Sequence, residues 1–384
     1  NATRILNING ASANGPITAE GTLIEGFTLT RGNGASPVAP GFGGAVYCYG
    51  DGDGHECSPS FSHVVFSANV VVTPRGGSSG GGAIRNTAGA GGASSPSFSH
   101  VTFDGNGAQF GGAVDNSTDL GGVSSPSFSD VTFNGNSASW GGAVYNGSAS
   151  GSASNPNFDN VTFSGNSATV NGGAVYSNSF ALPADASATS SPVFTHVTFW
   201  GNHADSFGGA LANFSSSTNG IARPVLRNTI LWGNTAATGA QVYNEGGASA
   251  GAVLTTSILQ DTGGCPSSAG FSCDAFTTAS GSADPLLGAL QDNGGSTFTH
   301  LPGAGSPALN QADTTFCLAT DQRGVPRPQG AGCDIGAVEV RVAAPPATGG
   351  VAAVPTLGEW ALALMALLAA GLGAAGLHGG RGRR

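Results

Sequence analysis

The sequence predicts an all-β protein, a right-handed parallel β-helix, that ends in a C-terminal hydrophobic helix. Three observations lead to this prediction. A unit of 30 to 37 residues repeats between residues 58 and 245, each unit holds short segments of alternating apolar residues, and no stretch before Trp360 shows helical periodicity. Because strands this short cannot form independent sheets, they must stack on copies of themselves as the coils of a solenoid.

Each unit opens with a proline, followed two residues later by a large apolar residue. Proline presets the backbone at a strand entry, where no ladder donor is needed. A Val-Thr-Phe segment follows, as at residues 101–103 and 131–133, and alternation places Val and Phe on one face and Thr on the other. We expect the Val and Phe side chains to face the core. The opening residues are Phe61, Phe98, Phe128, Phe158, Phe194 and Leu226.

An asparagine stands three residues after the second large apolar residue of every unit. Asparagine tolerates left-handed backbone geometry and bonds nearby main-chain groups. In stacked coils its amide can also bond the same amide of the next coil, so we predict a structural asparagine ladder at a turn, with Asn33 as an earlier member. The ladder residues are Asn69, Asn106, Asn136, Asn166, Asn202 and Asn234.

A Gly-Gly-Ala-Val motif or a close variant follows five or six residues later, as at Gly111 to Val114, and is degenerate at Gly239 to Val242. Paired glycines permit a tight corner. A second strand and a variable loop rich in Ser, Gly and Ala then complete the coil.

The chain divides into four parts by composition. We expect β-helix coils over residues 1–260, a closing segment over 261–340, a linker over 341–353 and a sorting signal over 354–384. The part of the closing segment from Asp284 to Glu339 could cap one end of the stack. Eighteen uncharged residues from Trp360 to Leu377 would form a helix of roughly 27 Å, enough to cross a bilayer. Arg381, Arg383 and Arg384 follow it, which is typical of a cytoplasmic end. The alternatives for this segment are a permanent C-terminal anchor and a buried helix.

The charge of the chain argues against binding to nucleic acid. With no Lys, 12 Arg and 22 acidic residues, the formal net charge is −10, so phosphates cannot be neutralised. The chain begins at Asn1 inside a strand-like run, so we expect the natural N-terminus and any export signal to lie outside it. Six cysteines form three close pairs, Cys48 with Cys57, Cys265 with Cys273 and Cys317 with Cys333. Local disulfides are the simplest of the 15 possible connectivities and would indicate an oxidising compartment.

Three segments resemble known families. Phe103 to Asn106 with Gly111 to Val114 is similar to the repeats of polymorphic outer-membrane proteins, and Asp284 to Glu339 resembles the choice-of-anchor segment of bacterial surface proteins. Residues Val354, Pro355, Thr356, Leu357, Gly358, Glu359 and Trp360 resemble the IPTL-type sorting signal, with Val354 in place of the usual Ile. The resemblance implies an exported cell-surface, envelope or extracellular protein, an exosortase-like machinery as its partner, and no established activity.

Two tryptophans are the sharpest ligand-binding candidates. Trp200 and Trp232 each follow an inward residue, so alternation should aim them outward and stack them in adjacent coils beside His203 and Asp205. Stacked indoles suit the apolar faces of sugar rings. The alternative is aromatic packing beneath a loop.

Catalysis is the other possibility, because polysaccharide lyases and glycoside hydrolases also use this pectin-lyase-like fold. Asp130 and Asp159, with Asp205, are the candidate carboxylates. The opposing interpretation is that Asp130 belongs to a structural bend column, which consists of His63, His100, Asp130, Asn160, His196 and Asn228.

The remaining charged candidates have structural interpretations beside the functional ones. Asp51 and Asp53 form a weak calcium candidate, with a metal-free acidic turn as its alternative. Asp321 and Arg323 are expected to form a structural ion pair. We therefore expect no cofactor and an exported noncatalytic surface or matrix protein, adhesive or structural, with polysaccharide binding or self-association left open. The alternative is a glycan-cleaving enzyme on the same scaffold.

Overall fold

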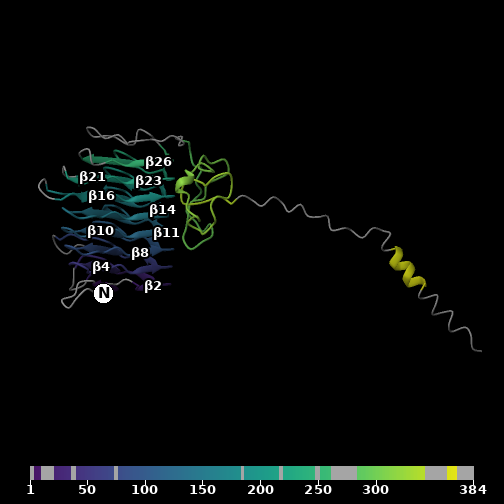
Figure 1. Ribbon diagram of the computed structural model, residues 1–384, viewed down its shortest axis with the longest axis horizontal. Coiled ribbons are helices and arrows are strands. Elements are labelled where there is room, and N and C mark those ends of the chain that lie inside the picture. The colour runs from purple at the N-terminus through teal and green to yellow at the C-terminus, as the bar shows by residue number, and fades with distance from the viewer. Residues whose placement is uncertain are drawn as a thin grey trace, which may run out of the picture. The chain divides into compact units, whose positions relative to one another are not determined.

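The structure is a computed structural model, and it describes residues 4–9, 21–35, 40–72, 77–182, 186–215, 219–246, 251–260, 283–341 and 361–369. The chain divides into two compact units, Asn1–Arg341 and Val342–Arg384. The first unit contains both the coils and the closing segment. It is a parallel β-solenoid, as the repeat predicts, with strands stacked in order from the N-terminal coil onward (Figure 1).

One face of the solenoid is an eight-stranded parallel sheet. From its second strand onward, each of its strands begins at the last residue of a Gly-Gly-Ala-Val motif or its variant and ends where the variable loop begins. Its strands, in spatial order, are β1 (Leu6–Asn9), β4 (Val46–Gly50), β7 (Ile84–Ala88), β10 (Val114–Thr118), β13 (Val144–Ser148), β16 (Val175–Ser179), β21 (Leu211–Ser215) and β25 (Val242–Gly246).

A 14-stranded sheet forms the second large face. Its strands before the bend in each coil are β2 (Leu23–Glu25), β5 (Ser60–Ser62), β8 (Ser97–Ser99), β18 (Val193–Thr195), β23 (Val225–Arg227) and β26 (Val253–Thr255). Those after the bend are β3 (Thr28–Thr30), β6 (Val65–Ser67), β9 (Thr102–Asp104), β19 (Thr198–Trp200), β24 (Ile230–Trp232) and β27 (Ile258–Leu259). In two coils the strand continues through the bend, as β11 (Ser127–Asn134) and β14 (Asn157–Ser164).

Smaller elements complete the coils. A three-stranded sheet holds β12 (Ser137–Trp140), β15 (Ser167–Asn171) and β20 (His203–Ala204), and β17 (Ala188–Thr189) pairs with β22 (Gly220–Ile221). The closing segment has one 3₁₀ turn, η1 (Thr314–Phe316).

The core consists of aromatic columns, and the predicted inward face is confirmed. Phe61, Phe98, Phe128, Phe158 and Phe194 are fully buried, as are the phenylalanines that follow five residues later. Rings in neighbouring coils stack with centroids 4.7 to 5.1 Å apart, close to the strand spacing of about 4.8 Å. Each coil therefore repeats its neighbour's side-chain positions.

The asparagine ladder forms as predicted from Asn69 to Asn234. The backbone N–H and the side-chain amide of Asn106 both donate to Oδ1 of Asn136, each at 2.9 Å, and the pattern repeats along the ladder. Asn33 is not a member, which corrects that prediction. The backbone N–H of Gly32 occupies the ladder position, and Asn33 instead accepts a bond from the Ala35 N–H.

The Gly-Gly corners have two separate causes. Gly111 has φ +57°, a left-handed conformation that only glycine adopts without strain. The next residue, Gly112, has an ordinary φ, but a Cβ there would overlap the carbonyl oxygen of Gly142 in the following coil. The first glycine turns the chain, and the second lets neighbouring coils approach.

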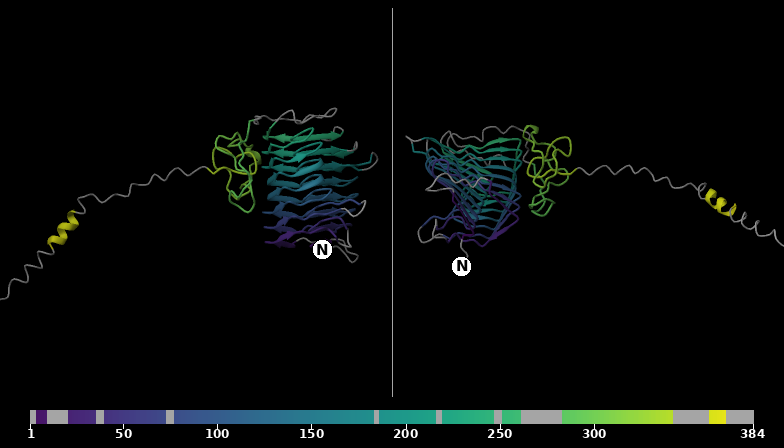
Figure 2. Two further views of the ribbon diagram at one scale, coloured as in Figure 1. Left: turned by 180° about the vertical axis from the view of Figure 1, so that it is seen from behind. Right: turned by 60° about the horizontal axis from the view of Figure 1, so that its bottom comes forward.

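The described part of the closing segment, residues 283–341, lies along the side of the solenoid, so the expectation that Asp284 to Glu339 could cap one end is wrong (Figures 1 and 2). Gln322 Nε2 donates to the Thr132 hydroxyl at 2.9 Å, and the Thr162 hydroxyl donates to Gln322 Oε1 at 2.6 Å. Ile335 packs with Ile230 of β24. These contacts cover the outward Thr132 and Thr162 and hold the segment against the 14-stranded sheet.

The structure bears on two further predictions about the chain's ends and cross-links. Disulfides Cys48–Cys57 and Cys317–Cys333 confirm local pairing, while Cys265 and Cys273 lie outside the described residues. In the second unit the described residues form a helix over 361–369, and the sorting motif from Val354 to Trp360 lies outside them. Among the described residues, no helix reaches the length and apolar character needed to cross a bilayer.

Candidate functional site

The outer face of the eight-stranded sheet carries a column of mostly large side chains, one from each strand after β1. Because the Val, Ile or Leu that opens each of these strands points into the core, the next residue points outward. Backbone register aligns these outward residues along the stack, in the order Tyr47, Arg85, Asp115, Tyr145, Tyr176, Ala212 and Tyr243. The hydrogen bonds that join the described closing segment to the described coils run to the other sheet, so this segment does not cover the eight-stranded face.

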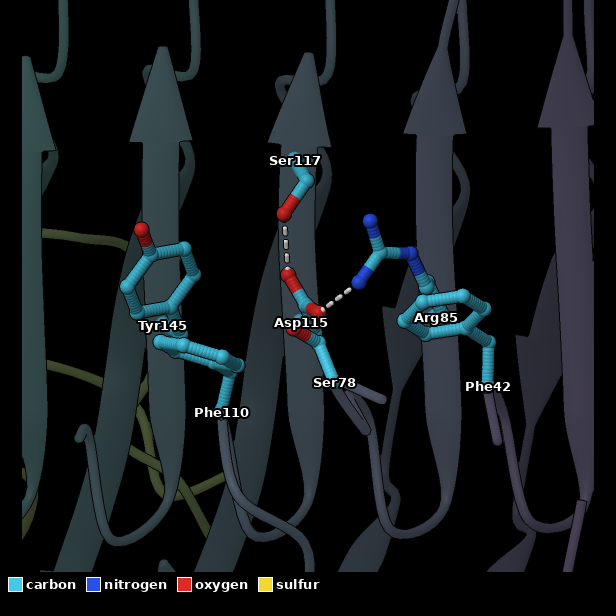
Figure 3. A pocket seen from close by; sticks show the side chains of 7 residues that line it. All are labelled: Phe42, Ser78, Arg85, Phe110, Asp115, Ser117 and Tyr145. Atoms are coloured by element: carbon cyan, nitrogen blue, oxygen red, sulfur yellow. Dashed lines mark hydrogen bonds and ion pairs between the residues drawn. The ribbon is translucent and has the colours of Figure 1, made fainter. Parts of the chain in front are cut away.

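A pocket of about 290 Å³ opens in the middle of this face (Figure 3). Arg85 on β7 points toward Asp115 on β10, and Tyr145 stands on β13 beyond them. Phe42 and Phe110, which each precede a Gly-Gly corner, supply the remaining aromatic walls.

An ion pair lies at the centre of the pocket. Arg85 Nη1 donates to Asp115 Oδ2, and the Ser117 hydroxyl donates to Asp115 Oδ1 at 2.5 Å. The Asp115 side chain is 0% exposed, whereas Arg85 is 16% exposed. Burial raises the pKa of Asp115, and the positive charge of Arg85 and the Ser117 hydrogen bond oppose that rise. The pair therefore presents a polar floor whose charges largely cancel.

Aromatic rings hold this floor in place. The Arg85 guanidinium lies over the Phe42 ring, 4.1 Å from its centroid, as a cation–π contact. Phe110 stacks on Trp140 at 4.9 Å and meets Tyr145 edge-on at 5.1 Å. Burial and the nearby Asp115 charge raise the pKa of Tyr145 to about 12, so its hydroxyl stays protonated at neutral pH.

A second pocket of about 300 Å³ adjoins the first and shares Arg85, Ser117 and Tyr145 with it. Asp119 and Phe180 line its far part. The two pockets together are called the outer groove below. Its half-exposed rings and its hydroxyl, guanidinium and carboxyl groups suit a ligand that has both apolar faces and hydroxyls.

The predicted tryptophan site lies on the other sheet. Trp200 and Trp232 occupy paired positions in β19 and β24, as expected for adjacent coils. The Trp200 ring lies 5.5 Å from the ring of His300 in the closing segment, and Trp232 packs against the apolar cluster around Ile335. His203 is exposed beside them and bonds Asp205 at 3.0 Å and the Thr235 hydroxyl at 2.8 Å. Ligand binding by these residues stays a prediction.

The candidate catalytic carboxylates do not occupy equivalent positions. Asp130 has φ +58° at the bend and aligns with Asn160, whereas Asp159 aligns with Ser129. Asn160 donates to Asp130 at 3.2 Å, and Asn157 donates to Asp159 at 2.6 Å. Burial raises the pKa of both carboxyls. The bend column adopts positive φ at all of its positions, namely His63, His100, Asp130, Asn160, His196 and Asn228.

The remaining candidate positions have local partners. Asp51 accepts a hydrogen bond from the Tyr49 hydroxyl at 2.7 Å, and Asp53 lies in the turn that follows. Among the described residues, no group of three or more His, Cys, Asp or Glu side chains is placed to hold a metal ion. Arg323 donates to Asp321 at 2.7 Å, and the buried pair joins two parts of the closing segment through the Glu339 backbone.

The fold defines a class first: the described residues form a parallel β-solenoid whose closing segment covers part of the outer face of the 14-stranded sheet. Residues 130–147 and 160–178 match the Chlamydia polymorphic membrane protein repeat, and residues 352–384 match the IPTL-CTERM motif. No curated protein and no solved structure matches the chain. The repeats and the C-terminal sorting motif, with the solenoid, indicate an exported cell-surface β-helix protein. The choice-of-anchor resemblance stays a prediction.

Sequence analysis missed the outer groove, although the repeat contains a signal for it. The residue before each Gly-Gly pair is aromatic at Phe42, Phe110, Trp140 and Phe207. The residue after the motif's last apolar position is the outward one by alternation. These two flanking positions contain the ion pair and the three aromatic residues of the first pocket, but not the loop residues that line the second.

Proposed function

We propose that this exported surface protein is a noncatalytic adhesive protein that binds glycans in the outer groove. The observation that carries the proposal is the Arg85–Asp115 pair, set between the rings of Phe42, Phe110 and Tyr145 on the open sheet face. Sugar rings have apolar C–H faces that pack on aromatic rings and hydroxyls that bond to charged groups. Both kinds of partner stand side by side in this groove.

The second part of the proposal concerns the C-terminus. We infer that an exosortase-like machinery recognises residues 354–384 and cleaves or exchanges this segment during export. The apolar side chains of Leu362, Leu364 and Leu367 are more than 60% exposed on the helix over 361–369, which supports a membrane-facing segment before processing. Mass spectrometry of the protein recovered from the cell surface tests this part, and an intact Arg384 terminus would contradict it.

Glycan binding is tested by screening the full chain against a panel of neutral and acidic polysaccharides, with reducing-end release measured in the same wells. The proposal expects retention without release of new ends, and loss of retention in Tyr145→Ala. The double variant Trp200→Ala/Trp232→Ala should keep retention, because those rings lie against the closing segment. New sugar ends would instead support the enzymatic alternative. No retention of any polysaccharide would overturn the proposed function.

A further inference from the structure

We infer that the ligand of the outer groove is an uncharged linear glycan that lies along the stacking direction of the coils. This inference rests on the proposed function and specifies its ligand class. Three features of the groove support it: its course across successive strands, the charges that line it and the aromatic path that continues beyond it.

The groove crosses successive strands obliquely, because its first pocket reaches Phe42 before β4 and its second reaches Phe180 just after β16. Its two pockets meet at Arg85, Ser117 and Tyr145, which stand on the three successive strands β7, β10 and β13 (Figure 3). Neighbouring strands are about 4.8 Å apart, a length comparable to one six-membered sugar ring. An extended chain of sugars can therefore place about one residue over each coil.

The aromatic path continues toward the C-terminal coils. Tyr145 stacks on Tyr176 at 5.6 Å, and the Tyr176 ring lies 5.1 Å from that of Phe214. Phe214 and Tyr243 follow at 5.6 Å, and Phe207 stacks on Tyr243 at 4.3 Å. These four rings lie in three further coils, and Phe207 and Phe214 are the partly exposed ones. A single small molecule would occupy one pocket, whereas rings that continue over three further coils suit a polymer.

The charges of the groove disfavour an acidic glycan. Arg85, Asp115 and Asp119 are its charged lining residues, and Arg85 is already paired with Asp115. The remaining carboxylate and the net charge of −10 on the chain repel uronate or sulfate groups. A neutral sugar meets no such repulsion, and its hydroxyls can donate to Asp119 and accept from the outward side of Arg85.

The test is calorimetric titration of the full chain with neutral hexasaccharides of glucose, mannose and N-acetylglucosamine, their disaccharides, and hexagalacturonate. At least one neutral hexasaccharide should bind at least tenfold more tightly than its disaccharide and than hexagalacturonate. Tyr145→Ala should weaken that binding at least tenfold. The matched control is Phe27→Ala, because Phe27 is 60% exposed and lies between strands of the other sheet.

A second variant tests the charge argument without removing a ring. Asp119→Asn should narrow the gap in affinity between hexagalacturonate and the neutral hexasaccharide, because it removes the negative charge of Asp119 and so raises the affinity for hexagalacturonate. Thermal unfolding of each variant shows that it is folded.

The outcomes separate this inference from the proposed function. Two outcomes would overturn the inference: hexagalacturonate binds more tightly than the neutral hexasaccharides, or a disaccharide binds as tightly as its hexasaccharide. If that binding is lost in Tyr145→Ala, glycan binding in the groove still stands. Binding that is equal in Tyr145→Ala and wild type, or no binding of any glycan, would overturn the proposed function itself.

Discussion

Arg85 and Asp115 stand at paired positions of neighbouring strands and form an ion pair whose carboxylate is completely buried. A buried ion pair is costly to desolvate, and removing one partner leaves an uncompensated charge. The pair is therefore tied both to the stability of the coils and to the polar floor of the outer groove.

The first prediction concerns the contribution of this pair to stability. Arg85→Ala should lower the free energy of unfolding by about 3–5 kcal/mol, because Asp115 loses its counter-charge. The double variant Arg85→Met/Asp115→Leu removes both charges and should be clearly more stable than the single variant. Urea unfolding measures both, and equal losses in the two variants would contradict the uncompensated-charge explanation.

The second prediction concerns acid stability at His196. Its ring is buried between Asn228 and the Gly336 carbonyl, and burial lowers its pKa to about 3. The unfolded chain binds this proton near pH 6.5, whereas the folded chain does not. Stability is therefore fully present above pH 6.5 and falls by about 1.4 kcal/mol for each pH unit from there down toward pH 3.

The matched variant for this test is His196→Asn, because Asn160 and Asn228 occupy the same bend position. Unfolding is measured from pH 8 to pH 4.5. The difference between wild type and variant should shrink or reverse as the pH falls. The pKa of His300 is also lowered by burial, but His300 is common to both proteins and cancels in the difference. A difference that does not change with pH would contradict the prediction.

A third prediction tests the asparagine ladder. Asn136→Ala removes the acceptor of two Asn106 donors and the donor to the Phe103 carbonyl, all buried, so we expect a loss of about 3 kcal/mol or more. Asn134→Ala is the control in the same turn, since Asn134 is half-buried and its amide bonds Asp104. Chemical unfolding should show a small effect for Asn134, and similar losses at both positions would argue against a special ladder contribution.

The fourth prediction addresses the closing segment. Gln322 bonds Val131, Thr132, Thr162 and Thr297, so Gln322→Ala should loosen the segment from the 14-stranded sheet before the coils unfold. Hydrogen exchange should show faster exchange over residues 284–339 and unchanged exchange in β7 and β10. Gln329→Ala, at a half-buried position whose side chain bonds the Pro326 carbonyl, serves as the control. Unchanged protection in Gln322→Ala would contradict this role.

The coils were predictable because their constraints recur. The repeat positions of Phe103, Asn106 and Gly112 each pack against the same residue type in the neighbouring coils. Their recurrence in the sequence therefore shows which positions the fold constrains. Asn33 was misassigned because it lies one residue beyond the ladder position. That position, three residues after the inward Leu29, is Gly32, whose backbone N–H donates to Asn69 Oδ1.

The covered face could not be predicted from the repeat. Alternation correctly placed Trp200 and Trp232 on the outside of the coils, but it does not reveal what packs against them. The partners of Thr132 and Thr162 lie more than 150 residues away in a segment without periodicity. Long-range contacts of this kind leave no local pattern in the sequence.

The last motif of the repeat reads Gly-Ala-Gln-Val, and its departure from Gly-Gly-Ala-Val has a structural reason. Gln241 takes the place of the inward alanine, and its Oε1 accepts the Asn234 amide at 2.8 Å, which would otherwise need an asparagine from a further coil. Gln241 therefore ends the asparagine ladder at Asn234 and limits its length. A duplicated unit inserted before it would extend the ladder and lengthen the displayed face, whereas one added after it would meet a ladder already closed.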